Sequence, residues 1–179
     1  MAADGWIAAA RRVPSPNCDS RPPGAEISLL LLHSISLPRG AYGGDAIERL
    51  FCNRLDPAAH PSFLDLAGLH VSSHFLIRRG GELLQFVPWQ ARAWHAGASR
   101  WRGRERCNDF SIGIELEGTD DGAFRRAQYA RLGQLVRSLQ ARLPIRELAA
   151  HSDVAPGRKS DPGMHFDWAH FLQQLACAA

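Results

Sequence analysis

The feature that most constrains the fold is an apolar run at residues 27–32, interrupted only by Ser28 and followed at once by His33. Such a run, without the alternation of a half-exposed strand, is typical of a strand buried on both faces. A strand of this kind needs cover on each side, so it predicts a sheet with helices packed against it. We expect the strand to end at His33, so that this side chain emerges at the sheet edge and faces a cleft.

Other segments with strand composition complete a mixed sheet: residues 73–79, 83–87, 92–95, 110–117 and 147–150. Gly80 and Gly81 separate the first two of these segments, and paired glycines suit the tight turn of a hairpin. The last segment ends at His151. In 110–117 the isoleucines share one face, and Glu115 lies on the opposite face with Ser111 because successive strand residues alternate.

Apolar residues recur at helical spacing between residues 125 and 143, and Pro144 ends the pattern. A short helix over 45–55 and a C-terminal helix over 166–175 are also expected. We therefore predict one α/β or α+β domain over residues 1–179, in which helices flank the central mixed sheet. The proline-containing segment 1–26 reads as an extended N-terminal arm, and the Gly-, Pro- and Asp-rich segment 38–68 as a possible flap over a site.

The charged residues exclude some classes of function. The net charge is +3, and the basic residues are 20 arginines and one lysine, Lys159, scattered without a basic arm, so we expect no nucleic-acid partner.

No apolar run approaches the roughly 20 residues of a membrane helix, and the N-terminus has no secretory apolar segment. We expect no membrane association and a cytoplasmic protein. The four cysteines, none in a C-x-x-C pair, are expected to be reduced structural thiols: Cys18, Cys52, Cys107 and Cys177.

Two strand-terminal histidines and one aspartate could form a metal site. His33, His151 and Asp161 offer two imidazoles and a carboxylate, the ligand set of many catalytic zinc ions. The spacing alone is not diagnostic, because a strand-terminal histidine is more often structural and Asp161 before Pro162 is an ordinary turn residue. The helical H-E-x-x-H signature is absent.

Several longer motifs make the sequence identifiable: residues 5–6 (GW), 11–16 (RRVPSP), 33–38 (HSISLP), 77–79 (IRR), 93–97 (AWHAG), 103–119 (GRERCNDFSIGIELEGT) and 155–163 (APGRKSDPG). With them the chain resembles the family-2 N-acetylmuramoyl-L-alanine amidases, which share their fold with the peptidoglycan-recognition proteins. The resemblance runs almost end to end.

The resemblance implies a bacterial zinc enzyme of peptidoglycan recycling. Its substrates would be small anhydro-muropeptides, cleaved at the amide between 1,6-anhydro-N-acetylmuramic acid and L-alanine. It also implies that His33, His151 and Asp161 hold one Zn²⁺, that Glu115 serves as general base and then acid, and that Lys159 stabilises the oxyanion. Without the resemblance, Glu115 and Lys159 would pass for solvated charges.

Substrate contacts are implied for a further set of residues: Arg106, Trp94, His95, Ser34 and His70. The alternatives are a surface ion pair for Arg106 and core packing for Trp94. The sequence departs from the family pattern at Ser34 and His70, where an asparagine and an arginine are typical, and at Gly157, where the family has an acidic residue. His74, in an apolar neighbourhood, is expected to be structural.

Two other functions compete with the recycling amidase. A non-catalytic muropeptide-binding protein is disfavoured because such receptors typically lose a metal ligand, and all three ligand types are present here. An amidase of polymeric peptidoglycan is disfavoured by the expected cytoplasmic location. We expect a monomer.

Overall fold

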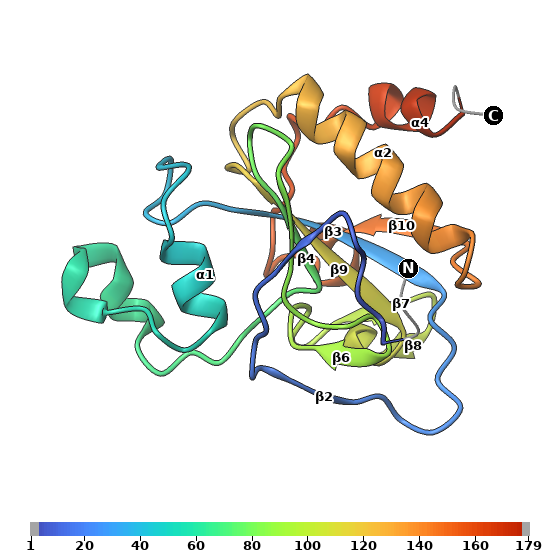
Figure 1. Ribbon diagram of the computed structural model, residues 1–179, viewed down its shortest axis with the longest axis horizontal. Coiled ribbons are helices and arrows are strands. Elements are labelled where there is room, and N and C mark those ends of the chain that lie inside the picture. The colour runs from blue at the N-terminus through green and yellow to red at the C-terminus, as the bar shows by residue number, and fades with distance from the viewer. Residues whose placement is uncertain (1–3, 177–179) are drawn as a thin grey trace.

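A six-stranded mixed sheet forms the centre of the protein, and the computed structural model describes it within residues 4–176 (Figure 1). In spatial order its strands are β1 (Arg11–Arg12), β5 (Leu83–Gln85), β4 (Phe75–Ile77), β9 (Ser111–Glu117), β3 (Leu29–Ile35) and β10 (Glu147–Ala150). Every neighbouring pair is parallel except the β4–β5 hairpin. The predicted mixed sheet and hairpin are confirmed.

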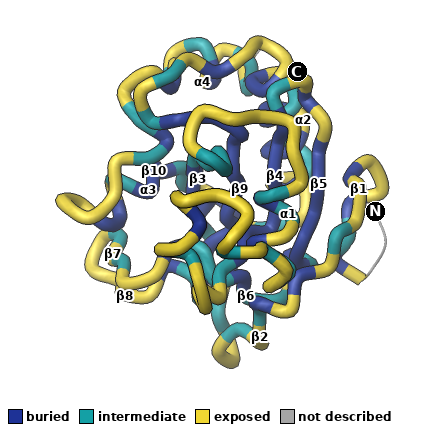
Figure 2. Tube along the Cα trace, turned by 90° about the vertical axis from the view of Figure 1, so that its left-hand side faces the viewer, coloured by how far each residue is buried: buried dark blue, intermediate teal, exposed yellow. Residues whose placement is uncertain are grey.

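Helices cover both faces of the sheet, as the doubly buried strand predicts. The helices α2 (Arg126–Gln140) and α4 (Trp168–Ala176) lie above the sheet in Figure 1. They share a core with the even-numbered side chains of the central strands, including Leu30, Leu32, Ile112 and Ile114. On the other face, α1 (Ala46–Phe51) packs with Leu76 and Leu84 in a second cluster. Figure 2 shows the central strands buried beneath exposed loops.

The strand β3 differs from its predicted bounds. It begins at Leu29 and continues to Ile35, so His33 lies inside the strand and not at its end. The reason is that β9 runs parallel beside it, and the pairing continues to Ile35 opposite Glu117. The same register places His33 opposite Glu115. Side chains of directly paired residues point to the same face of a sheet, so His33 and Glu115 share one face.

The predicted strand at 92–95 does not belong to the central sheet. It forms as β6 (Ala91–Ala93) and pairs antiparallel with β2 (Cys18–Ser20) in a separate two-stranded sheet. The expected N-terminal arm therefore contributes two strands, because β1 also pairs with the edge strand β5. Another small sheet joins β7 (Arg100–Trp101) to β8 (Arg104–Glu105).

Short helices complete the described chain: the 3₁₀ helices η1 (Pro57–Ala59), η2 (Pro61–Leu66) and η3 (Cys107–Asp109), and the single turn α3 (His151–Val154). Cys18, Cys52 and Cys107 are free thiols, as expected, and Cys177 lies outside the described residues. Among residues 4–176 there is no helix with the length and apolar character needed to cross a bilayer.

Candidate active site

Three side chains predicted as metal ligands converge on one point. His33 comes from β3, His151 begins α3 directly after β10, and Asp161 lies on the loop that follows. Because β10 pairs with β3 so that Ala150 faces Leu32, the chain delivers His151 beside His33. The Nδ1 atoms of the histidines are 2.9 Å apart, and Asp161 Oδ2 lies 3.0 Å from His151 Nδ1 and 3.2 Å from His33 Nδ1.

This arrangement fits a metal ion. Tetrahedral zinc bonds of about 2.0–2.1 Å place ligand atoms roughly 3.3 Å from one another, close to the three separations found here. The far nitrogen of each ring has its own partner, since His151 Nε2 lies 3.3 Å from Ala96 O and His33 Nε2 lies 2.9 Å from His95 Nδ1. A carbonyl can only accept, so with a metal at the centre His151 would carry a hydrogen on Nε2 toward Ala96 O and offer its Nδ1 lone pair to the ion.

The protonation states also suit metal binding. Burial lowers the pKa of His33 from 6.5 to about 4, which keeps its imidazole neutral at physiological pH. Burial alone would raise the pKa of Asp161, but its contacts with His151 and His33 outweigh burial and hold the pKa below 3.8. The site thus combines a neutral imidazole at His33 with an ionised carboxylate at Asp161.

Glu115 reaches the same site from β9 and is 8% exposed. Burial raises the pKa of Glu115 well above 4.5, and the nearby charge of Asp161 raises it further. Its Oε2 atom is buried and has no hydrogen-bond partner in the protein. A buried carboxyl oxygen without a partner, beside a candidate metal centre, is placed to accept a proton from a water molecule.

The loop after α3 carries both Lys159 and Asp161. Its path is fixed by main-chain hydrogen bonds, from Ser152 N to Asp161 O at 3.1 Å and from Lys159 N to Ala155 O at 3.1 Å. Gly157 has a φ of 75°, so the residue that departs from the family pattern takes a backbone conformation that favours glycine. Lys159 is exposed and lines the cavity with the ligands, where its charge lowers the pKa of Glu115 against the effect of burial.

A cavity of about 260 Å³ opens over these residues. One wall is polar and holds the ligands, Glu115 and Lys159. The rest of the lining is largely apolar, and much of it comes from the segment that the sequence marks as a flap or from residues beside that segment: Leu37, Leu50, Phe51, Leu66 and Leu69. The site therefore lies between the carboxyl ends of β3 and β9 and the α1–η2 region.

Of the residues predicted to contact the substrate, some line this cavity and others lie outside it. Ser34 and His95 line it. His70 lies in an adjoining hollow of about 220 Å³ and Arg106 in another of about 490 Å³. Trp94 is outside the cavity lining.

Two arginines that the sequence reasoning did not select lie beside the site. Arg158 and Arg39 line a hollow of about 390 Å³ that shares Ser34, Lys159 and Asp161 with the metal cavity. Arg158 Nη2 donates to Ala96 O at 2.8 Å. The position of Arg158 inside the 155–163 motif, directly before Lys159, was the signal that could have identified it.

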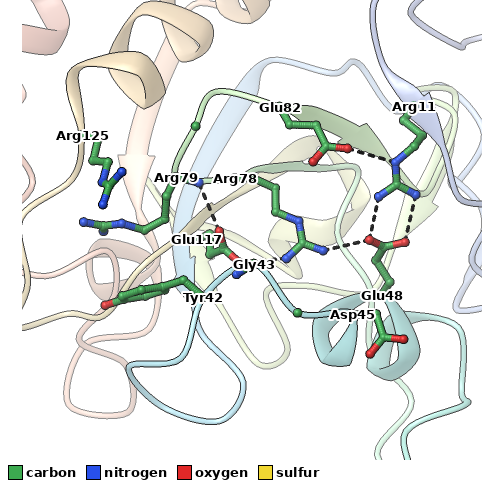
Figure 3. Close-up of a pocket in the computed structure, with 12 residues that line it drawn as sticks. Arg11, Tyr42, Gly43, Asp45, Glu48, Arg78, Arg79, Glu82, Glu117 and Arg125 are labelled. Carbon is green, nitrogen blue, oxygen red and sulfur yellow. Dashed lines mark hydrogen bonds and ion pairs between the residues drawn. The ribbon is translucent and has the colours of Figure 1, made fainter.

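A more distant hollow, of about 510 Å³, contains none of the metal-site residues (Figure 3). Its floor is an ion-pair network in which Arg78 bridges Glu117 and Glu48, each at 2.8 Å. Glu117 is 1% exposed and also accepts from the main-chain N–H of Arg79 and Gly43. The network joins α1 to the end of β9, so Glu117 is structural although it shares a strand face with Glu115.

Comparison with known proteins adds independent information. A family model described as N-acetylmuramoyl-L-alanine amidase matches residues 23–164. The chain is 55% identical over 170 residues to the 1,6-anhydro-N-acetylmuramyl-L-alanine amidase AmpD of Citrobacter freundii, covering 94% of this chain and 91% of the relative.

Solved structures agree with these relatives. A crystal structure of a selenomethionine AmpD derivative matches with a TM-score of 0.95 and 53% identity, over 98% of this chain and 99% of that one. The Escherichia coli amidase AmiD, solved with the substrate anhydro-N-acetylmuramic acid-L-Ala-D-gamma-Glu-L-Lys, matches with a TM-score of 0.61 and 33% identity, over 86% of this chain and 60% of that one.

Proposed function

Because the chain belongs to the N-acetylmuramoyl-L-alanine amidase family, we propose that it hydrolyses the amide between 1,6-anhydro-N-acetylmuramic acid and L-alanine in muropeptides. The observation that carries this proposal is the convergence of three metal-ligand atoms within 3.2 Å of one another, beside a buried carboxyl group.

We propose zinc as the metal, held by His33, His151 and Asp161. Two imidazoles and one carboxylate form a donor set that leaves a coordination position open for chemistry. When bound, zinc polarises a carbonyl oxygen and lowers the pKa of a coordinated water to about 7. The protein's part is to keep the His33 imidazole neutral and the Asp161 carboxylate ionised, which burial and the contacts within the triad accomplish.

Glu115 moves the protons in this proposal. Its raised pKa makes the carboxylate a better proton acceptor than an exposed glutamate, so Oε2 takes a proton from the attacking water. The protonated carboxyl group then donates to the amine of L-alanine as the amide bond breaks. Without that proton the leaving group would be an amide anion, which is a very poor leaving group.

Lys159 supplies positive charge where the carbonyl oxygen becomes an oxyanion. The lining of the cavity includes Lys159 together with His33 and Glu115, and within the described chain no carboxylate forms an ion pair with its ammonium group. A compact ammonium group on a flexible stem can follow the oxygen as it moves out of the amide plane.

The sugar and the peptide stem would occupy the metal cavity and the adjoining hollow lined by Arg39 and Arg158. Ser34 lines both and is proposed as a substrate contact. Arg106 shares a further hollow with Arg158, so it is proposed to meet the distal part of the stem. His70 is proposed to contribute from its own hollow, which shares Leu50, Leu66 and Leu69 with the metal cavity.

The segment 38–68 is proposed to open and close over the site, because its apolar side chains form a wall of the cavity. Hydrogen exchange of this segment should slow when a muropeptide binds. Equal exchange rates in the free and bound protein would contradict the flap.

We further propose that the protein acts as a monomer in the cytoplasm. The three described cysteines are free thiols, which suits a reducing compartment. Size-exclusion chromatography with light scattering tests the oligomeric state, and cell fractionation tests the location.

The deciding experiment compares substrates and metal states in one assay. The purified protein is treated with a chelator, reloaded with zinc, and given anhydro-muropeptides or intact sacculi. We expect free peptide from anhydro-muropeptides only with metal. Full activity of metal-free protein would refute the metal mechanism, preference for sacculi would favour the polymer amidase, and binding without cleavage would favour a receptor.

A further inference from the structure

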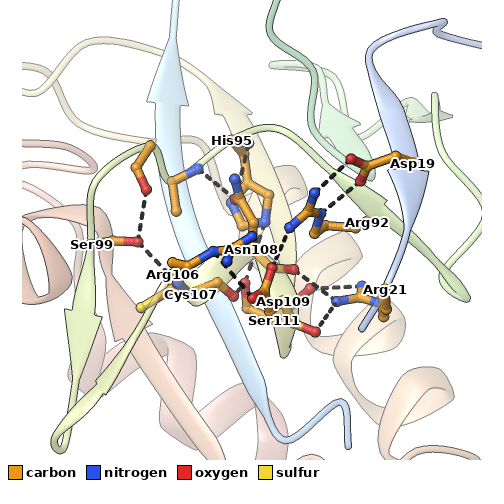
Figure 4. A network of polar contacts seen from close by, with 12 residues as sticks. Asp19, Arg21, Arg92, His95, Ser99, Arg106, Cys107, Asn108, Asp109 and Ser111 are labelled. Carbon is orange, nitrogen blue, oxygen red and sulfur yellow. Dashed lines mark hydrogen bonds and ion pairs between the residues drawn. The ribbon is translucent and has the colours of Figure 1, made fainter. Parts of the chain in front are cut away.

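A chain of hydrogen bonds leads away from the metal site into the protein behind it. It runs from His33 through His95 and Ser111 to the carbonyl oxygen of Cys107. Figure 4 shows the far part of this chain, with His95 above Ser111 and Cys107. We propose that His95 is a positioning residue which, held by Ser111, fixes His33 in the tautomer whose Nδ1 is free to bind the metal.

The direction of each hydrogen bond follows from the far end of the chain. Cys107 O can only accept, so the Ser111 hydroxyl, 2.6 Å away, donates to it. The hydroxyl has one proton, so at its other contact, 3.3 Å from His95 Nε2, the Ser111 oxygen accepts. His95 Nε2 therefore carries a hydrogen.

The same logic continues to the metal ligand. Within the described chain no carboxylate hydrogen-bonds to the His95 ring, so a neutral imidazole is the form its surroundings favour. A neutral ring with hydrogen on Nε2 has a lone pair on Nδ1, and this atom accepts from His33 Nε2 at 2.9 Å. His33 then has no hydrogen on Nδ1, the atom that faces His151 and Asp161.

The position of His95 is itself fixed on several sides. A Cβ atom on Gly113 would lie 2.6 Å from both Cγ and Nδ1 of His95, so only glycine leaves room for the ring at this point of β9. Asn108 Oδ1 accepts from the main-chain N–H of His95 at 3.2 Å and of Ala96 at 2.8 Å. Arg21 in turn binds the main-chain oxygens of Asn108 and Ser111, each at 2.9 Å.

One short segment thus contacts both histidines of the site. The side chain of His95 sets the tautomer of His33, and the carbonyl of Ala96 lies 3.3 Å from Nε2 of His151. Partners of this kind orient a ligating imidazole and increase its basicity, and their loss commonly lowers metal affinity by about 10–100-fold. Both ring nitrogens of His95 are occupied, so His95 has no ring nitrogen left to bind substrate.

The inference rests on the proposed function in taking His33 as a metal ligand, and its first test needs neither metal nor activity. In metal-free protein labelled with ¹⁵N-histidine, at mildly alkaline pH, we expect long-range ¹H–¹⁵N spectra to show His33 and His95 as Nε2–H tautomers. A Nδ1–H tautomer of His33 in the wild type would overturn the proposal. Failure to bind zinc at all would instead overturn the proposed function.

The second test measures zinc affinity by competition with a chromophoric chelator. We expect a loss of about 10-fold for Ser111→Ala and toward 100-fold for His95→Leu. His95→Asn, whose Oδ1 can accept from His33 Nε2 in place of the lost Nδ1, should remain within a few-fold of wild type. Thermal unfolding of each metal-free variant identifies any that fails to fold.

Ser73→Ala is the matched control. The Ser73 hydroxyl is buried near His95 and has no hydrogen-bond partner. The substitution therefore removes a serine hydroxyl, as Ser111→Ala does, without breaking the series of hydrogen bonds from His33 to Cys107. We expect its zinc affinity and histidine tautomers to equal those of wild type. Equal affinities for Ser111→Ala, Ser73→Ala and wild type would overturn the proposal.

Discussion

Replacing Glu115 by glutamine separates proton transfer from metal binding. Glutamine has nearly the same shape, so the side chain should stay in the buried position opposite His33. It cannot accept a proton from water or deliver one to the leaving amine. The metal ligands are unchanged, so the variant should bind zinc as wild type does.

The size of the effect follows from what else could replace the lost base. General acid–base groups typically contribute about 10²–10⁴-fold to a rate. The other acidic residue lining the cavity is Asp161, whose Oδ2 faces the two histidines and whose pKa is held low. With no second carboxyl group available, we expect kcat to fall toward the upper end of this range, about 10³–10⁴-fold or roughly 4–5.5 kcal/mol.

The same substitution should stabilise the metal-free protein at neutral pH. The folded-state pKa of Glu115 is raised above its ordinary value of 4.5, so the stability this group contributes is present below that pH and lost as pH rises through the folded-state pKa. Glutamine does not ionise and avoids this loss, which is about 1.4 kcal/mol for each unit of the rise. Urea unfolding of metal-free wild type and Glu115→Gln should diverge as the pH increases.

Glu117→Gln is the matched control, because Glu117 lies on the same face of β9 and is also buried. Its carboxylate pairs with Arg78, so this variant should lose a few kcal/mol of stability while its folded fraction keeps kcat. Peptide release is followed by chromatography. A Glu115→Gln enzyme within tenfold of wild-type kcat, with zinc bound, would refute the assignment of Glu115 as the proton carrier.

Four further outcomes are expected. Removing the metal should abolish peptide release and lower the unfolding temperature, and zinc should restore both; an unchanged unfolding temperature would argue against a metal bound by the folded state. Lys159→Met should lower kcat by about 10²–10³-fold, with Lys159→Arg recovering only part, whereas equal activity of both variants and wild type would exclude an oxyanion role. Because the pKa of His33 falls from 6.5 to about 4, the stability it contributes to metal-free protein is present above pH 6.5 and lost toward pH 4, about 3 kcal/mol in all. The non-titrating His33→Asn should show a correspondingly smaller loss in urea unfolding. Gly113→Ala should displace His95, destabilising the fold by about 1–3 kcal/mol and weakening zinc binding; retained affinity would show that the ring can move without consequence.

The sequence correctly predicts those helices and strands that are specified by a short stretch of neighbouring residues. The strand β10 has the predicted bounds, and α2 and the β4–β5 hairpin occur where periodicity and paired glycines place them. Segment 92–95 shows the limit of such signals. Its composition is that of a strand, but its partner is β2, more than 70 residues earlier, and only the folded chain brings the two together.

The length of β3 was underestimated for a related reason. A polar residue after an apolar run predicts the end of a strand, yet β9 supplies pairing partners for two more residues. The three residues that could hold a metal can be selected from sequence, because residue types and motifs single them out. The proposed tautomer of His33 could not be, since it depends on His95, which lies in a segment distant in sequence from His33.

One signal in the sequence does point to the inner part of the site. The strand 111–117 is buried along its whole length, yet one face carries Ser111, Gly113, Glu115 and Glu117. Burying polar side chains is costly unless each has a partner, so such a face implies that polar groups meet it from the other elements. The structure supplies those groups for Ser111 and Glu117, and Gly113 makes room for the His95 ring. Of these four residues Glu115 alone keeps a buried oxygen without a partner, and this is the observation that supports the proposed role of Glu115 in proton transfer.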